Sequence, residues 1–151
     1  TLQANSIATI MLCFGCLIAG LVVDRIGSSL TFIIGSLLLA GASWAFYHLV
    51  GSHPEQLFLL YGMVGLCVGV VGAVPYVMVR AFPPEVRFTG ISFSYNVSYA
   101  IFGGLTPIAV TLLMGVSPMA PAWYVLALSL MGLALGLWLR QKPVEVPVLA
   151  G

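Results

Sequence analysis

The segment GLVVDRIGSS, residues 20–29, contains the first charged side chains of the chain and separates two long apolar runs. The run before its charged pair, residues 5–23, and the run after it, residues 30–50, contain no Asp, Glu, Lys or Arg. A helix needs about 20 apolar residues to cross a hydrocarbon core about 30 Å thick. Both runs have that length, so the segment predicts a tight turn between two membrane-spanning helices.

Three more apolar runs follow, at residues 56–79, 88–116 and 123–139. Charged residues make up 6% of the chain and hydrophobic ones 61%, with a mean hydropathy of +1.13. A soluble domain carries about 25% charged residues, so this chain has too few polar groups to cover a water-facing surface. We therefore predict an all-α membrane protein with five transmembrane helices within residues 1–140, followed by a cytoplasmic tail, 141–151.

The basic residues occupy only alternate gaps between the runs. They are Arg25 in the first gap, Arg80 and Arg87 in the third, and Arg140 and Lys142 after the last run. Lys and Arg near membrane spans stay on the cytoplasmic side. This pattern predicts an N-terminus outside and a C-terminus in the cytoplasm, in the plasma membrane (the inner membrane of a bacterium).

Few other functional classes fit the composition. No basic cluster is large enough to bind nucleic acid. Cys13 and Cys16 have C-x-x-C spacing but lie inside an apolar run, where small-residue packing explains them better than redox chemistry. His48 and His53 lack the further ligands that a metal site requires. We expect no enzyme, no metal and no cofactor.

The first gap resembles a known loop signature. Gly20, Asp24, Arg25 and Gly27 match the Gly-x-x-x-Asp-Arg-x-Gly pattern of the major facilitator superfamily, where two basic residues follow. Here Ser28 and Ser29 replace that basic pair, which favours the weaker second copy of the signature, after the eighth helix. Residues 82–90, 95–96 and 103–107 look like the metabolite:proton symporter branch, which includes proline/betaine, shikimate and dicarboxylate carriers.

The resemblance implies a partial C-terminal bundle, helices eight to twelve of a twelve-helix transporter. The chain begins with Thr1 rather than Met, and we expect a longer protein. The implied function is proton-coupled symport of a small osmolyte or organic acid, by rocking of one bundle against the other. The implied partners are a small-molecule metabolite, the lipid bilayer and the missing N-terminal half. The alternative is a five-span accessory or assembly subunit without transport activity of its own.

Two interpretations stand for the charged gaps. Asp24 with Arg25 is either a solvated turn or a latch, in which the aspartate engages the positive N-terminus of a facing helix. The resemblance implies that such contacts hold the cytoplasmic side closed. The start of the fourth helix, predicted at Glu85 to Arg87, could then receive the matching aspartate from the missing half. It belongs to the second cytoplasmic loop, which also carries Arg80.

Two stripes stand out within the spans. Gly62, Gly65, Gly69 and Gly72 follow helical spacing, which indicates close helix packing or a smooth seam on which the helix rocks. Ser92, Tyr95, Asn96 and Tyr99 form a polar stripe, which indicates interhelical hydrogen bonds or a position near the substrate path. Thr106-Pro107 predicts a kink, with the threonine hydroxyl available for a carbonyl that the proline frees.

The charge pattern generates a topology prediction. In a variant whose three native cysteines are replaced, single cysteines at Ser52 and Ser117 should react with a membrane-impermeant maleimide added outside, and one at Ser28 should not. The reason is that the gaps without Lys or Arg face outward. Equal labelling at all three positions in intact cells would contradict the predicted orientation.

Overall fold

The computed structural model describes residues 2–142, so Thr1 and nearly all of the predicted tail lie outside the described residues. Its α-helices are α1 (Leu2–Ile26), α2 (Ser28–Leu49), α3 (Leu57–Val68), α4 (Val74–Ala81), α5 (Arg87–Ser98), α6 (Gly104–Met114) and α7 (Ala120–Gln141). Two 3₁₀ turns, η1 (Pro54–Gln56) and η2 (Gly69–Ala73), and one π-helical turn, η3 (Tyr99–Gly103), continue the helices they adjoin.

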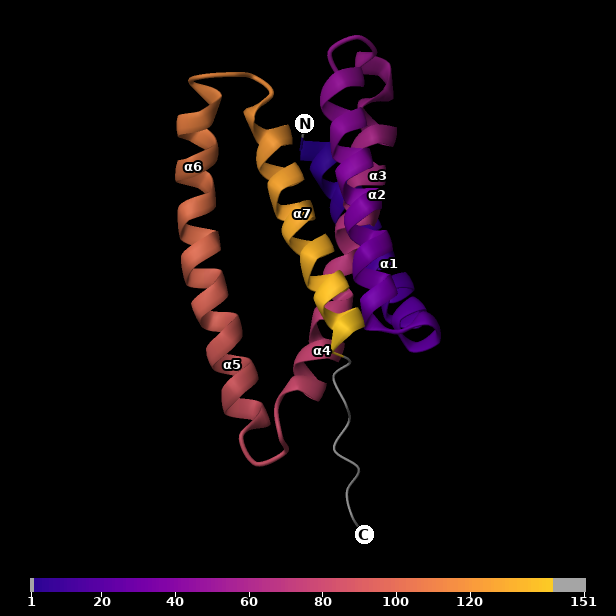
Figure 1. Ribbon diagram of the computed structural model, residues 1–151. Helices are drawn as coiled ribbons and strands as arrows, with labels where there is room; N and C mark the ends of the chain where they lie inside the picture. The colour runs from indigo at the N-terminus through magenta and orange to yellow at the C-terminus, as the bar shows by residue number, and fades with distance from the viewer. Residues whose placement is uncertain (1, 143–151) are drawn as a thin grey trace.

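These elements join into five helical stretches that are long and apolar enough to cross a membrane. They are Leu2–Ile26, Ser28–Leu49, Pro54–Ala81, Arg87–Met114 and Ala120–Gln141. No strand occurs among residues 2–142, and the prediction of an all-α fold with five membrane-length helices is confirmed. The chain reverses after each stretch, so the segments that carry the basic residues all lie at one end of the bundle (Figure 1).

The turn between α1 and α2 consists of one residue, Gly27. Its φ of 83° lies in the left-handed region that glycine adopts without steric cost. Its N–H donates to the carbonyl of Val23 at 3.0 Å, and its carbonyl accepts from the Thr31 hydroxyl at 2.7 Å. Asp24 and Arg25 consequently lie on the last helical turn of α1 rather than in a loop.

The first and third stretches approach each other at their backbones. A Cβ added at Gly65 would meet the backbone of Ala8, and one added at Gly69 would meet the backbone of Gly15. Gly72 lies against Cys16 in the same way, while Gly62 faces the side chains of Ile7 and Met11. Small residues permit such close contact, which lipid alone does not drive.

The third stretch is not a continuous α-helix. The 3₁₀ turn η2 separates α3 from α4, and Pro75 lies in the first turn of α4. Proline lacks the N–H that would bond to the carbonyl four residues earlier, and its ring crowds that carbonyl. The glycine pair at residues 69 and 72 tolerates the tighter turn, which is usual for short 3₁₀ segments.

A second close contact joins α2 to α7. The Ser29 hydroxyl donates to the carbonyl of Gly136 at 2.7 Å, and a Cβ added at Gly132 would come 2.5 Å from the Oγ of Ser36. Small residues recur every seventh position along both helices, the spacing of a helix–helix seam. They are Ser29, Ser36 and Ser43 on α2, and Ala122, Ser129 and Gly136 on α7.

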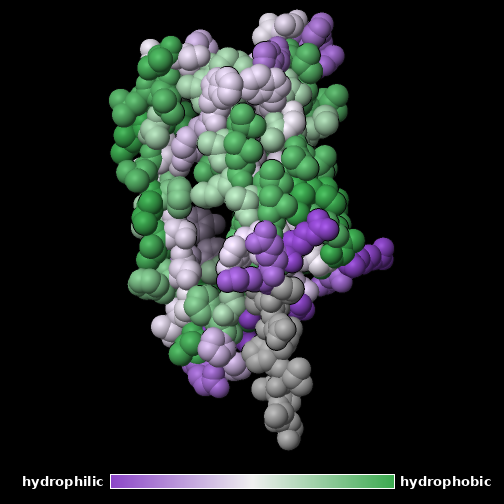
Figure 2. Space-filling view, viewed as in Figure 1, coloured by the Kyte–Doolittle hydropathy of each residue, from purple (hydrophilic) through white to green (hydrophobic). Residues whose placement is uncertain are grey.

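The fourth stretch, formed by α5, η3 and α6, lies at one edge of the bundle, where α6 is beside α7 and α5 is farther from it (Figure 1). No residue in its most apolar window is buried. The π-helical turn comes just before Pro107, whose ring would crowd the carbonyl of Gly103 in a regular α-helix. Hydrophobic side chains cover much of the visible surface, and hydrophilic ones gather toward its ends (Figure 2).

The backbone contact at Gly69 generates a stability prediction. Gly69→Ala should lower the free energy of unfolding by about 1–3 kcal/mol, because the added methyl overlaps the backbone of Gly15. The measurement is the midpoint of unfolding by sodium dodecyl sulfate in mixed micelles.

Gly41→Ala is the matched control, since a Cβ at Gly41 would meet no atom within 4 Å. It should be neutral or stabilising, because alanine favours helix over glycine by about 1 kcal/mol. Equal midpoints for the two variants would show that the Gly69 contact does not hold the bundle together.

Candidate functional site

The residues of the loop signature lie at the end of α1 and in the turn after it. Asp24 and Arg25 are both exposed. Neither side chain takes part in a hydrogen bond or ion pair with another of residues 2–142. The carboxylate of Asp24 therefore remains available to a group outside this part of the chain.

The loop between α4 and α5 has its own internal contacts. Arg87, the first residue of α5, donates its Nε–H to the carbonyl of Phe82 at 3.2 Å. The Phe82 ring lies against Gly90, where a Cβ would come 2.5 Å from it. The guanidinium carbon of Arg80 lies 3.9 Å from the centre of the Tyr76 ring. Glu85 is exposed.

The loop differs from its sequence-based expectation in one respect. Pro83, Pro84 and Glu85 form a turn in which the N–H of Val86 donates to the carbonyl of Pro83, and α5 begins only at Arg87. No side chain caps that helix start. The first N–H groups of α5, which lack partners within the helix, are accordingly open to an acceptor.

In the polar stripe of the fourth stretch, Asn96 and Tyr99 are exposed, and Ser92 and Tyr95 are half-buried. The amide nitrogen of Asn96 donates to the carbonyl of Ser92 within the same helix at 2.8 Å. The rings of Tyr95 and Tyr99 stack with centroids 5.9 Å apart, and 68% of the Tyr99 surface is exposed. Within residues 2–142, these contacts of the stripe are all made inside its own helical stretch. No residue in the most apolar window of that stretch is buried by another helix.

Thr106 has a different partner from the one expected at the proline kink. Its hydroxyl lies 2.7 Å from the hydroxyl of Tyr124 on α7. The hydroxyl of Thr111 separately donates to the carbonyl of Pro107, within its own helix, at 2.7 Å. The Thr106–Tyr124 pair is the one side-chain hydrogen bond between α6 and α7 among residues 2–142, and residue type alone did not identify it.

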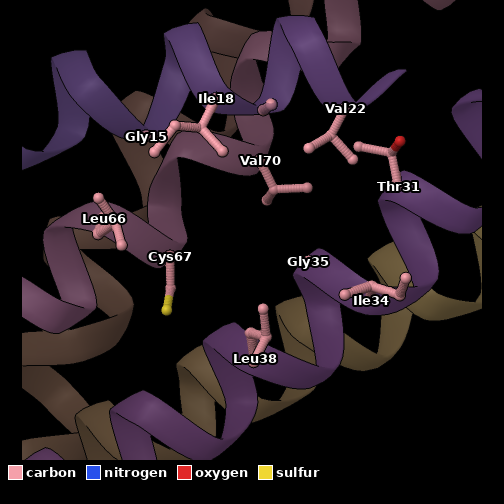
Figure 3. A pocket seen from close by; sticks show the side chains of 11 residues that line it. Gly15, Ile18, Val22, Thr31, Ile34, Gly35, Leu38, Leu66, Cys67 and Val70 are labelled. Atoms are coloured by element: carbon pink, nitrogen blue, oxygen red, sulfur yellow. The ribbon is translucent and has the colours of Figure 1, made fainter. Parts of the chain in front are cut away.

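An apolar cavity of about 170 Å³ lies between α1, α2 and the third stretch (Figure 3). Its walls are mainly aliphatic, with Thr31 and Cys67 as the exceptions. Because the Thr31 hydroxyl already donates to Gly27, the cavity offers little to a polar metabolite. No group of three or more His, Cys, Asp or Glu that could hold a metal occurs within residues 2–142.

The chain is similar in sequence to several known transporters. The chain is 40% identical over 96 residues to the inner membrane metabolite transport protein YhjE of Escherichia coli, a match covering 60% of this chain and 21% of that protein. It is 30% identical over 120 residues to a putative proline/betaine transporter of Staphylococcus aureus, a match covering 77% of this chain and 26% of that protein. It is 29% identical over 106 residues to the citrate-proton symporter of Klebsiella pneumoniae, a match covering 64% of this chain and 22% of that protein.

The matched part is about a quarter of the length of these relatives. No family model matches the chain. No solved structure matches it.

The contact between α6 and α7 generates a prediction for a double-mutant cycle. Thr106→Val and Tyr124→Phe should show a coupling free energy of about 0.6 kcal/mol in unfolding, up to about 1.7, as membrane hydrogen bonds do. Thr111→Val is the matched control, because its hydroxyl bonds within its own helix. If Thr111→Val couples to Tyr124→Phe as strongly, the Thr106–Tyr124 bond does not join the two helices.

Proposed function

We propose that this chain, a homologue of transporters of the major facilitator type, is the C-terminal portion of a secondary active transporter. The loop signature predicted a resemblance to this family, and the three transporters that the chain matches confirm it. The transporter would couple the movement of a small osmolyte or organic acid to protons across the bacterial inner membrane. A proline/betaine transporter and a citrate-proton symporter among the relatives support that substrate range.

One structural observation carries the proposal that a further bundle is needed. The fourth stretch has no buried residue in its most apolar window, yet it presents a tyrosine pair and Asn96. Polar side chains in a membrane helix face protein or water rather than lipid. A second bundle, the proposed N-terminal half, would cover this face and leave a path for the metabolite beside it.

The loop residues take their proposed roles from the same arrangement. Asp24 would act as a latch, because its carboxylate is exposed at the basic end and has no partner among residues 2–142. The uncapped start of α5 would receive an aspartate from the other half in the reciprocal contact. We place this end in the cytoplasm on the strength of its five basic residues.

The glycine face of the third stretch serves the mechanism in this proposal. Three of its glycines, Gly65, Gly69 and Gly72, contact the backbone of α1, so α1 and the third stretch would move as one unit. The helices joined in this way would rock together against the other half, as one bundle against another.

The second candidate is a five-span accessory subunit, and genomic sequence distinguishes it from the first. A transporter requires an open reading frame that continues upstream through about seven more apolar spans, since each major facilitator half has six. A start codon directly before the codon for Thr1 would favour the accessory subunit.

The latch generates a prediction for transport. In the complete transporter, Asp24→Asn should lower proton-dependent uptake severalfold at equal protein abundance, because the amide keeps the size of the side chain but loses its charge. Uptake of labelled substrate into intact cells is the measurement.

Glu55→Gln is the matched control, an exposed acid at the opposite end of the bundle. It should leave uptake unchanged. Wild-type uptake by both variants would remove the latch from the mechanism.

A further inference from the structure

The basic end of the bundle contains a hollow of about 320 Å³ between the start of α2, the middle and end of α4 and the end of α7. Its walls include Ser28 and Ser29 from α2, Tyr76 and Arg80 from α4, and Arg140 from α7. Three helices that are distant in sequence thus bring two arginines to one hollow. Neither Asp nor Glu is among the described residues that line it.

The start of α2 offers further donors to the same hollow. The first three N–H groups of a helix have no acceptor within it, and here Thr31 is the first residue whose N–H bonds back, to Gly27 at 3.2 Å. No side chain caps the helix start. The Ser29 hydroxyl donates to Gly136, whereas the Ser28 hydroxyl has no partner among residues 2–142.

The two arginines differ in how they are held. Arg80 is half-buried, and its guanidinium carbon lies 3.9 Å from the centre of the Tyr76 ring, within the range of a cation–π contact. Its N–H groups make no hydrogen bond to another of residues 2–142. Arg140 is exposed at the end of α7. Two forked donors and a helix start together suit a tetrahedral anion with several acceptor oxygens, which describes a phosphate group.

The surroundings favour a phosphate that carries hydrocarbon chains. Leu137 and Trp138, just before Arg140 on α7, are 46% and 52% exposed. Tryptophan is enriched where headgroups meet the hydrocarbon core, and basic pockets between helices on the cytoplasmic side bind anionic headgroups. We propose that this hollow binds the phosphodiester of an anionic phospholipid in the cytoplasmic leaflet.

This inference rests on the proposed orientation in the membrane and not on transport activity. The test therefore measures how many lipid molecules stay bound to the protein, and of which kind. The full chain is reconstituted in nanodiscs made from equal amounts of phosphatidylglycerol and phosphatidylcholine. After gentle release from the nanodisc, native mass spectrometry counts each lipid that stays bound to the protein.

We expect phosphatidylglycerol to be enriched over phosphatidylcholine. A basic residue near an anionic surface contributes about a fivefold gain in binding, so Arg140→Gln and Arg80→Gln should each reduce the enrichment about fivefold. Arg140→Gln is the more secure variant, because the exposed Arg140 side chain makes no hydrogen bond with another of residues 2–142. Lys142→Gln is the matched control, since it removes the same charge at the same end but does not line the hollow.

A second arm separates lipid phosphate from free phosphate. Inorganic phosphate added at increasing concentration should leave the bound phosphatidylglycerol in place. If inorganic phosphate displaces the lipid and raises the unfolding temperature in the wild type but not in Arg140→Gln, the occupant is a soluble anion and the lipid assignment is overturned. Equal enrichment in wild type, both arginine variants and the lysine control would overturn the site itself.

Discussion

Close approach of helix backbones at small residues is the interaction on which the rest of the structure depends. Lipid offers no hydrophobic drive to bring helices together, so packing must come from surface fit and from a few hydrogen bonds. The contacts of Gly65 with Ala8 and of Gly69 with Gly15 join the first and third stretches. The hydrogen bond from the Ser29 hydroxyl to the Gly136 carbonyl joins the second stretch to the last one. These two seams form two helix pairs. The buried cluster of Val23, Phe32, Ala73 and Leu139 joins the two pairs into a unit of four helices.

The fourth stretch is the exception to this packing, and the proposed second bundle would account for it. Its α6 half meets α7 through Thr106 and Tyr124, while its α5 half is tied to the preceding loop by Arg87 and Phe82. Between these ties lie the π-helical turn and the polar stripe, with no described helix against their outer side. This stretch contacts its neighbours at Arg87 and at Thr106 and is uncovered between them. Such an uncovered face is suited to lie against another bundle.

Much of this architecture follows from sequence, because its causes are local. Apolar run length predicts the five spans, and charge placement predicts that the basic residues share one end. The glycine stripe is visible because its members lie close together in one run. The continuation of α1 through Asp24 and Arg25 was not predicted, because charge suggests a loop although a helix end serves equally well. The late start of α5 was missed for the same kind of reason, since Pro83 and Pro84 are compatible with a first helical turn.

Other features depend on which helices become neighbours, and sequence periodicity does not determine that. Ser129 looks isolated along the last run, yet it is 3% exposed and belongs to the seven-residue series that faces α2. The partner of Thr106 could not be read from residue type, because the choice between its own helix and Tyr124 depends on helix rotation. The hollow of Arg80 and Arg140 likewise depends on which helix ends meet there, since its walls come from α2, α4 and α7.

We propose that these five helices form part of a proton-coupled transporter and cannot transport alone. Coupling needs a group that exchanges a proton within the pathway, and no Asp, Glu, His, Lys or Arg lies in the central portion of any of the five spans. The most direct measurement is the accumulation of labelled proline, betaine or citrate in liposomes that contain only this chain, under an imposed pH gradient. The account predicts no accumulation above that of empty liposomes. Accumulation that collapses on adding a protonophore would contradict it.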